Sequence, residues 1–507
     1  MSLESQGAQS LAPVPPDFID IKKRVLAYLR ANTQSPLKLE LLELQKQSVA
    51  HMVALRYSLL WDDMGLGKTA QALAVNLLTQ SDKTLIFCPN NIKKVWFAEI
   101  MKFTHFGATD IYTGKADELV SLTDTVIDRF KFFIFNYETL RVAFKTRDII
   151  PSIFYRISHT ILDEVHRFRN SYILDYIAFY HFFSKQPSRI LTMATGTPID
   201  KYIGEVWPYL ALMDMNPAVE GYPFLKRFPN QEYFNERYAI LKGSKETKEG
   251  YMQNSYGYYQ EKTFHEIKHL IGPRVIRREI QDAVEMPKIH SRYLRIPDSA
   301  FPDKDWDEVL VKFQRLARLQ SQKKLKEDEE IAVAAIQKLR VEIALRKAWY
   351  TYKQSLPYLQ HGPIVIFSEF IKPLLEFQYW AQAEGHRCLM VVGRDMSLQE
   401  REDNIEEFKK AQTPFLLATF GAMAEGENLQ VSNVMLFNDI PWQPSIIVQA
   451  QRRIWRIGQA RECYHEIMTC RGDDFVINVV LQKEAMVKKL ETDIVEIQKS
   501  AEYNVSP

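Results

Sequence analysis

Short apolar runs, each bounded by turn residues, alternate with longer helical patterns over the first 200 residues. They fall at residues 84–89, 130–136, 159–164 and 189–198. Four similar runs occur far downstream, at residues 363–370, 386–393, 414–421 and 434–440. Such an alternation is typical of buried parallel strands joined by helices. The pattern therefore predicts an α/β protein with two separate units, each built on a parallel sheet.

The pattern differs between the two units and at the ends of the chain. Residues from about 205 to 270 mix helical and polar stretches, and we interpret them as an insertion in the first unit. Residues from about 300 to 356 place Leu, Ile and Ala at helical spacing among many charges, which predicts a helical protrusion with a solvated charged face. We expect a loose segment over 1–36, a first unit over 37–290, and a second unit over 291–507 that ends in a helix.

Composition and charge restrict the possible architectures and sites but do not indicate a function. The 507 residues suffice for at least two cores. With 65 basic and 63 acidic residues the net charge is only +2, so a site for a polyanion must be a local arrangement. The four cysteines lack the paired spacing of a zinc site or a disulfide framework. Because no apolar run approaches the length of a membrane span, we expect a soluble, intracellular protein without a membrane partner.

The segment LLWDDMGLGKTAQALA joins an apolar run to a helix through a glycine-rich turn. Gly65 and Gly67 allow the backbone N–H groups to point at phosphate, Lys68 can reach the outer phosphates, and the hydroxyl of Thr69 can bind Mg²⁺. The start of the helix adds a positive partial charge. The turn predicts a site for ATP and Mg²⁺ that is lined by Asp63, Met64, Gly65, Leu66, Gly67, Lys68 and Thr69. Asp62 takes the position that is glycine in the usual pattern of such turns.

An acidic pair follows about one hundred residues later, in ILDEVHRFRN. Asp163 and Glu164 end a predicted buried strand, at the sheet edge where carboxylates emerge beside a phosphate-binding turn. We expect Asp163 to hold Mg²⁺ and Glu164 to polarise the attacking water. An Asp-Glu pair can also cap a helix, so it is the combination with the upstream turn that favours the catalytic interpretation.

The chain resembles the Swi/Snf branch of the superfamily-two helicase-like ATPases in six segments that follow the order of the family's motifs. They are DDMGLGKT, LDEVHRFRN, ATGTPI, IVIFSEF, AEGENLQ and QAQRRIWRIGQ. The resemblance extends from about residue 41 to 475. It implies two RecA-like parallel-sheet lobes in tandem with short helical protrusions, and a DNA-dependent ATPase.

The resemblance also implies roles for residues near the nucleotide in the first lobe. Gln45 would read the edge of the adenine. Thr195, Gly196 and Thr197 would couple the nucleotide site to DNA, by hydrogen bonds toward His166.

Further nucleotide contacts are implied for the second lobe. Gln449, Arg453 and Arg456 match the final motif, in which the two arginines act as fingers on the γ-phosphate. Gly426 lies in a motif that contacts the incoming nucleotide. Trp455 stands where the family usually has histidine.

The residues that the resemblance places on DNA suit a grip on the phosphate backbone rather than a reading of bases. They are Asn91, Lys93, Lys94, Tyr137, Ser368, Thr419 and Asn428. The implied partner is double-stranded DNA, bound independently of its sequence, with branched DNA as a further candidate and a protein cargo that the sequence does not identify.

We therefore predict a translocase on duplex DNA that displaces or remodels bound protein or DNA structures. Three alternatives stay open. The chain could be a true DNA helicase, including a branch-migration or annealing enzyme. It could also be an RNA helicase, or an ATP-gated binding switch with little turnover.

Overall fold

The computed structural model divides the chain into two compact units. Unit 1 comprises Met1–Val284 with Met486–Pro507, and unit 2 comprises Glu285–Ala485. The structure describes residues 14–31, 37–115, 117–146, 149–200, 202–219, 224–246, 252–257, 264–301, 305–321, 329–393, 395–423 and 427–499. Among these residues, none of the helices combines the length and the apolar character that crossing a membrane requires.

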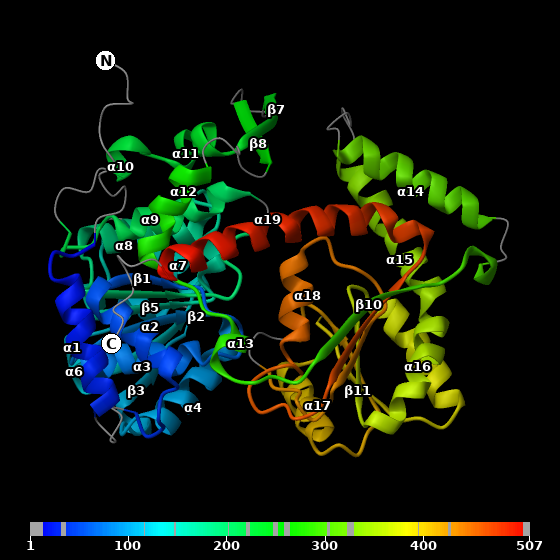
Figure 1. The fold of residues 1–507 in the computed structure, drawn as a ribbon, viewed down its shortest axis with the longest axis horizontal. Helices are drawn as coiled ribbons and strands as arrows, with labels where there is room; N and C mark the ends of the chain where they lie inside the picture. Colours follow the sequence, from blue (N-terminus) through cyan, green and yellow to red (C-terminus); the bar gives the residue numbers. More distant parts are fainter. Residues whose placement is uncertain are drawn as a thin grey trace. The chain divides into compact units, whose positions relative to one another are not determined.

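Unit 1 is built on a seven-stranded parallel sheet with the strand order β3-β4-β2-β5-β6-β1-β9 (Figure 1). The strands are β1 (Tyr57–Leu60), β2 (Thr84–Cys88), β3 (Ile111–Thr113), β4 (Phe132–Asn136), β5 (His159–Asp163), β6 (Ile190–Ala194) and β9 (Val275–Ile276). In a parallel sheet the carboxyl ends of all strands lie at one edge. The segments that follow β1, β5 and β6, which are neighbours in the sheet, therefore meet at that edge.

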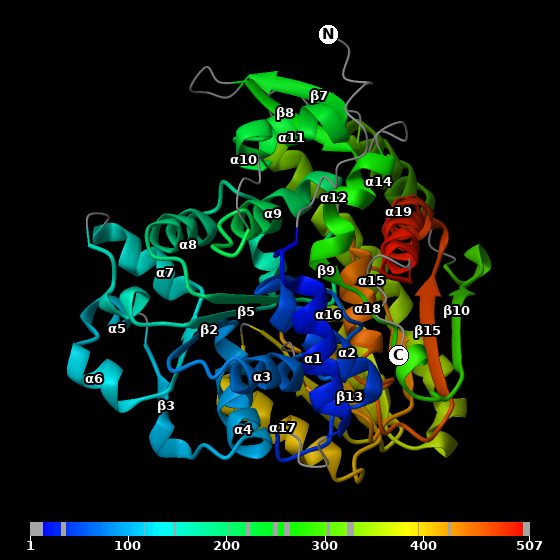
Figure 2. The same cartoon turned by 60° about the vertical axis from the view of Figure 1, so that its left-hand side comes forward.

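Helices cover both faces of this sheet, and each face has its own apolar core (Figure 2). Along β2, Leu85 and Phe87 belong to the first core, while Ile86 and Cys88 belong to the second. Because strands buried on both faces carry apolar residues at every position, they read in the sequence as continuous apolar runs.

The helices sort between the two cores. The first core includes residues of α7 (Glu138–Ala143), α8 (Leu174–Lys185), α9 (Trp207–Met213), α10 (Phe224–Arg227), α11 (Gln231–Tyr238) and α12 (Phe264–Ile271). The second includes residues of α1 (Phe18–Ala31), α2 (Glu43–Leu55), α3 (Lys68–Leu78) and α4 (Lys93–Phe103). Unit 1 also contains three short helices: α5 (Glu118–Ser121), α6 (Asp124–Arg129) and α13 (Ile280–Ala283).

Helix α1 lies within the segment that the sequence predicted to be loose. Phe18 and Leu29 are buried in the second core, and Ile21 and Val25 pack against it. The prediction of a loose segment is therefore wrong for Phe18–Ala31, because apolar residues at helical spacing bring one face of this helix onto the core.

The segment between residues 205 and 270, predicted as a helical and polar insertion, contains both helices and strands. Besides α9 to α12 it contains an antiparallel hairpin of β7 (Ile240–Glu246) and β8 (Met252–Gly257), with an irregularity between Leu241 and Gly243. These two strands contain few apolar residues, so the alternation that marks a strand is weak in their sequence.

Unit 2 is built on a six-stranded parallel sheet with the order β10-β15-β14-β11-β13-β12. The strands are β10 (Ile289–Arg295), β11 (Ile364–Ser368), β12 (Cys388–Val391), β13 (Phe415–Thr419), β14 (Val434–Phe437) and β15 (Cys463–Thr469). The helices are α14 (Asp305–Ser321), α15 (Glu329–Ser355), α16 (Ile371–Ala383), α17 (Leu398–Lys409) and α18 (Pro444–Gln451). Helix α19 (Asp474–Lys499) begins in unit 2, and its residues from Met486 onward belong to unit 1. The predicted fold class, α/β with two parallel-sheet units in tandem, is confirmed.

The charged segment predicted as a helical protrusion is partly buried. Arg340 and Lys347 of α15 are 6% and 0% exposed. Arg340 donates to the Glu369 carboxylate at 2.9 Å, and the Lys347 ammonium lies 2.9 Å from the Asp473 carboxylate. The prediction of a solvated face is wrong for these two residues, because opposite charges brought from elsewhere in unit 2 compensate their burial.

Candidate nucleotide and DNA sites

The glycine-rich turn runs from the end of β1 into α3. Gly65 has φ +92° and Gly67 has φ +69°, a region that glycine enters readily and other residues rarely. Gly67 immediately precedes α3. The first N–H groups of a helix have no partner within it and carry a positive partial charge, so this turn has the form of an anion-binding site.

Lys68 folds back over this turn. Its Nζ donates to the carbonyl oxygens of Asp62 and Asp63 at 3.0 and 3.1 Å. Burial lowers the pKa of Lys68, and the carboxylates of Glu164 and Asp62 oppose that effect. The side chain thus places a cation among acidic groups at the edge of the sheet.

Asp62, which replaces the usual glycine, is turned into the protein. It is 1% exposed, and its Oδ2 accepts a hydrogen bond of 3.0 Å from Nε2 of Gln71, which also donates to the carbonyl oxygen of Leu66 at 3.0 Å. Burial raises the pKa of Asp62, and the nearby Arg278 lowers it. Through Gln71, the buried Asp62 side chain stabilises the turn. This role explains why the position can carry a side chain where the usual pattern has glycine.

Gln45 also holds the turn. Its Nε2 donates to the carbonyl oxygen of Leu66 at 2.9 Å, and its Oε1 accepts from the N–H of Leu42 at 2.8 Å. A Cβ at Gly67 would come within 2.9 Å of that Nε2. The structure places Gln45 beside the predicted nucleotide site, while its role toward adenine stays a prediction.

Asp163 lies at the carboxyl end of β5, where it pairs in register with Ala194 of β6. Its Oδ2 accepts from the indole Nε1 of Trp96 at 2.7 Å, and its Oδ1 accepts from the N–H of Glu164 at 3.0 Å. Burial and the neighbouring Glu164 carboxylate raise the pKa of Asp163 to about 7. A nearby cation would therefore stabilise the ionised form of the Asp163–Glu164 pair.

This donor set fits Mg²⁺. The ion usually takes one or two carboxylates together with phosphate oxygens and water, rather than a cage of protein ligands. Asp163 supplies a carboxylate at the end of β5, and Thr69 supplies a hydroxyl in the first turn of α3. The described part of the chain has no group of three or more His, Cys, Asp and Glu side chains that could hold a metal ion.

His166, Glu164 and Thr195 form one polar cluster. Nδ1 of His166 lies 3.1 Å from Oγ1 of Thr195 and 3.0 Å from Oε2 of Glu164. Oγ1 of Thr195 lies 3.4 Å from the same Oε2 and accepts from the N–H of Thr197 at 3.2 Å. Glu164 has φ +50°, an uncommon conformation of the kind that functional sites retain. The predicted hydrogen bond toward His166 is present, and coupling to DNA stays a prediction.

Gly196 and Thr197 continue from β6 alongside the glycine-rich turn. A Cβ at Gly196 would come 2.8 Å from Cγ of Met64 and 3.7 Å from Nζ of Lys68. The carbonyl oxygen of Thr197 accepts a hydrogen bond from Arg169. A side chain at position 196 would therefore require the Met64 side chain to move.

Asp63 is held by an ion cluster that the sequence did not reveal. Its Oδ1 lies 2.9 Å from Nη1 of Arg277, and its Oδ2 accepts from the N–H of Ile280 at 3.1 Å. Nη2 of Arg277 lies 3.4 Å from the carboxylate of Glu491 on α19, and the Arg277 side chain is 5% exposed. Asp63 and Arg277 are separated by 214 positions in the sequence, so no local sequence pattern indicates their contact.

Replacing Arg277 with alanine is expected to lower the stability of unit 1 by about 3–5 kcal/mol, because two carboxylates lose a buried partner. The denaturation midpoint in urea measures the effect. Arg237→Ala is the control, because Arg237 forms a more exposed ion pair with Glu266 at 2.6 Å. That control should cost about 0–1 kcal/mol. Equal midpoints for the two variants would contradict the role of the cluster.

Three of the predicted DNA contacts lie at the start of α4. Asn91 is half-buried in the turn before the helix, and Lys94 is exposed. Nζ of Lys93 donates to the carbonyl oxygen of Gly114 at 3.0 Å. The structure brings the three residues together on one segment, and contact with DNA stays a prediction.

Tyr137 and Ser368 do not fit their predicted role on DNA. Both side chains are 0% exposed. The hydroxyl of Tyr137 donates to the carbonyl oxygen of Asp163 at 2.7 Å, and that of Ser368 donates to the carboxylate of Asp439. The prediction is corrected for these two side chains, because acceptors inside the protein take up their hydroxyl groups.

Three further predicted DNA and nucleotide contacts of unit 2 lie at the end of β13 and in the segment after it. Thr419 is 7% exposed at the end of that strand. Asn428 is exposed, and its side chain forms hydrogen bonds with Gln430. Gly426 lies outside the described residues.

The two predicted arginine fingers converge on one carbonyl group. Nη1 of Arg453 and Nη1 of Arg456 each lie 3.5 Å from the carbonyl oxygen of Glu427. Gln449 is half-buried on α18, one turn earlier. Hydrogen bonds of this length are weak, and contact of the two arginines with phosphate stays a prediction.

Trp455, which takes the place of the family's usual histidine, is a core residue. It is 3% exposed, and its Nε1 donates to the carbonyl oxygen of Pro287 at 2.7 Å. The Arg452 guanidinium lies 4.4 Å from the centre of its ring. The tryptophan thus anchors the segment between α18 and β15 to the start of unit 2.

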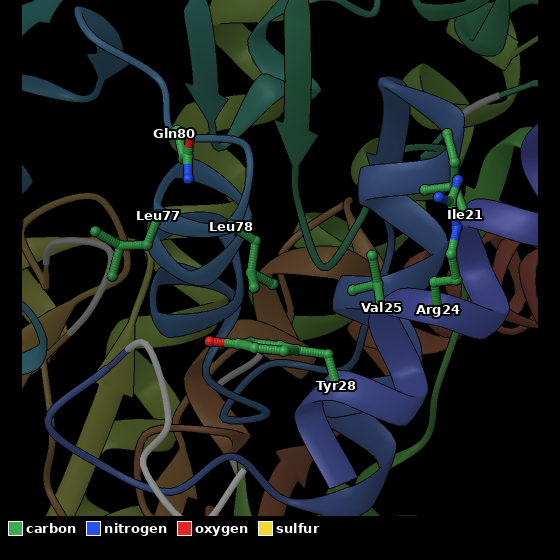
Figure 3. Close-up of a pocket in the computed structure, with 7 residues that line it drawn as sticks. All are labelled: Ile21, Arg24, Val25, Tyr28, Leu77, Leu78 and Gln80. Carbon is green, nitrogen blue, oxygen red and sulfur yellow. The ribbon is translucent and has the colours of Figure 1, made fainter. Parts of the chain in front are cut away.

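A separate open pocket of about 460 Å³ lies at the other end of α3 (Figure 3). Its lining residues are Ile21, Arg24, Val25, Tyr28, Leu77, Leu78 and Gln80. Because α3 begins at the glycine-rich turn and ends at this pocket, the pocket is not the predicted nucleotide site.

Comparisons with known proteins bear on these sites. The family model described as SNF2-related domain matches residues 44–351, and that described as helicase conserved C-terminal domain matches residues 351–458. The chromodomain-helicase-DNA-binding protein 1-like of Mus musculus is 23% identical over 462 residues, which cover 86% of this chain and 48% of the relative. The DNA repair and recombination protein RAD54-like of Drosophila yakuba is 24% identical over an alignment of 507 residues. That alignment covers 87% of this chain and 60% of the relative.

The chain therefore spans about half to three-fifths of the length of these two relatives. Among solved structures, the Sulfolobus solfataricus SWI2/SNF2 ATPase core in complex with dsDNA aligns with a TM-score of 0.40 and 17% identity. That alignment covers 92% of this chain and 96% of the solved chain.

Proposed function

The chain belongs to the SNF2-related family of helicase-like ATPases, and from this premise we propose that it hydrolyses ATP to move along double-stranded DNA. The movement would displace or remodel bound protein or DNA structures. One observation carries the proposal: Lys68, the Asp163–Glu164 pair and the Thr195 segment meet at one edge of the unit 1 sheet.

Unit 1 would bind the nucleotide and prepare the attacking water. The N–H groups of the glycine-rich turn and the ammonium of Lys68 would neutralise phosphate charge. Asp163 and Thr69 would hold Mg²⁺, which would offset the negative charge that develops on the phosphate oxygens. Glu164, held by His166 and Thr195, would orient the water.

Unit 2 would supply the arginines. Arg453 and Arg456 would stabilise the charge that develops on the transferred phosphoryl group. Because Lys68 and Asp163 are carried by unit 1, full activity would require both units to act on the same nucleotide. A DNA that favours such a state would then stimulate hydrolysis.

Duplex DNA is the proposed track. The matched relatives bear the names of a helicase-DNA-binding protein and of a DNA repair and recombination protein, which supports DNA as the polymer. The exposed Lys94 at the start of α4 and the exposed Asn428 suit contacts with phosphates and sugars. Contacts of this kind position a protein on DNA without reading the sequence.

Duplex DNA is expected to stimulate ATP hydrolysis at least about fivefold, within the usual range of coupling between two sites. The measurement is steady-state phosphate release with duplex, single-stranded and forked DNA and with RNA, at several salt concentrations. Because phosphate contacts release counterions, the stimulation should weaken as salt rises.

The same preparations should displace a third strand from a triplex without separating a plain duplex. Separation of forked strands would instead favour the helicase alternative. Stimulation by RNA alone, or nucleotide binding without turnover, would contradict translocation on DNA.

A further inference from the structure

Trp96 is a buried tryptophan whose one polar atom faces the acidic pair. It is 2% exposed, and it packs in the second core of unit 1 with Ile92 and Ile100. Its indole Nε1 donates to Oδ2 of Asp163 at 2.7 Å across 67 residues of sequence. This length is typical of a hydrogen bond to a charged acceptor, which is about twice as strong as a neutral one.

The indole of Trp96 restricts the orientation of the Asp163 carboxylate and the acceptor positions that stay open on it. An ionised carboxylate has about four acceptor positions on its two oxygens. The N–H of Trp96 occupies one position on Oδ2, and the N–H of Glu164 occupies one on Oδ1. The carboxylate is thus held in one orientation, with a further position on each oxygen for a ligand.

The same side chain belongs to the helix that begins at the predicted DNA contacts. Helix α4 begins at Lys93, three residues before Trp96, and Asn91 lies in the turn before it. Because the indole is packed in the core, it moves as one body with α4. A shift of the first turn of α4 would therefore reach Asp163 through a single hydrogen bond.

We propose that Trp96 is a positioning residue for ATP hydrolysis, which fixes the Asp163 carboxylate and ties it to the segment that contacts DNA. The proposal rests on the proposed function, since it assigns a path from the DNA contact to the metal-binding carboxylate. It is separate from the His166–Thr195 cluster, which connects the acidic pair to β6 instead.

If Trp96 had only a structural role, its substitution should affect hydrolysis no more than the substitution of another buried tryptophan. A buried tryptophan usually needs an acceptor for its N–H in any case. Trp207 provides the comparison within unit 1: it is 5% exposed, and its Nε1 donates to the carbonyl oxygen of Phe228 at 3.0 Å. Trp207→Phe therefore removes the same buried N–H bond from a tryptophan that does not touch Asp163.

The experiment compares Trp96→Phe with Trp207→Phe in the full chain. Unfolding temperatures should fall to a similar extent in both variants. In Trp96→Phe alone, kcat should fall about 10- to 100-fold, as when other partners of metal-binding side chains are removed. The stimulation by duplex DNA should fall with it. Binding of a fluorescent ATP analogue in EDTA should match the wild type, and only binding in Mg²⁺ should weaken.

Two outcomes would overturn the role of Trp96. One is an equal loss of kcat in the two tryptophan variants. The other is loss of analogue binding by Trp96→Phe in EDTA, which would show general damage to the fold. Absence of any response of the wild type to duplex DNA would instead defeat the proposed function.

A double-mutant cycle with Asp163→Asn tests the path itself. If Trp96 acts through Asp163, Trp96→Phe should have no further effect on Mg²⁺-dependent analogue binding once Asp163 is replaced. An equal fold-loss in both backgrounds would show that the two residues act independently, and would overturn the proposal.

Discussion

Lys68→Ala is expected to lower kcat for ATP hydrolysis by at least about 10² to 10³-fold, the range found when one donor to a developing charge is removed. Without the ammonium, a triphosphate would face the carboxylates of Asp163 and Glu164, so nucleotide binding should also weaken. Phosphate release under saturating duplex DNA gives kcat, and titration of a fluorescent ATP analogue gives the affinity.

Lys83→Ala is a matched control for that change. Lys83 is 7% exposed, and its Nζ donates to the carbonyl oxygens of Asp128 and Phe130, both at 2.9 Å. Both variants therefore lose an ammonium group that two carbonyl groups hold. Lys83→Ala should reduce the unfolding temperature and keep hydrolysis. A rate for Lys68→Ala that equals that of Lys83→Ala would refute the assignment of Lys68.

The strands of both sheets were largely predictable, because burial on both faces leaves a direct trace in the sequence. All eight apolar runs contain a strand, from β2 in unit 1 to β14 in unit 2. Strands at the margins were harder to predict. The two residues Val275–Ile276 of β9 are too few to form a run, and none of the seven positions of β10 is fully buried. The polar hairpin of β7 and β8 left no clear pattern either.

Within the site, sequence reasoning found the groups that a local motif carries. The glycine-rich turn and the acidic pair each depend on neighbouring residues with fixed chemistry. It could not find the partners that distant segments bring, such as Trp96 for Asp163 or Glu491 for Arg277. Such contacts depend on the packing of whole helices, which no short segment encodes.

The sequence also could not predict whether a polar side chain points into the protein or toward a ligand. Tyr137 and Ser368 stand next to strand ends, as the residues of such sites do, but they point inward. Arg340 and Lys347 lie in a charged run and are nevertheless buried beside Glu369 and Asp473. A polar residue near a site can serve the ligand or the fold, and only the three-dimensional structure separates the two.

Arg456→Ala is expected to lower kcat by about 10³-fold or more, as for arginines that stabilise the transferred phosphoryl group in other phosphoryl-transfer enzymes. Arg453→Ala should have an effect in the same direction. Affinity for the ATP analogue should change little in either variant, because most of the proposed contacts of the bound nucleotide lie in unit 1. Arg456→Lys should stay impaired, since a lysine keeps the charge but loses the planar fork of donors.

Arg461→Ala separates this chemistry from a loss of structure. Arg461 also lies in unit 2, and it donates to the carbonyl oxygens of His361 at 2.8 Å and Val431 at 2.6 Å. Arg461→Ala therefore removes an arginine that holds two backbone segments of unit 2, and it measures how far such a loss alone lowers hydrolysis. If hydrolysis falls equally in both variants, the arginines support the fold of unit 2 and do not act on phosphate. A loss of kcat confined to Arg453 and Arg456, with analogue binding intact, would identify groups that act in the transition state.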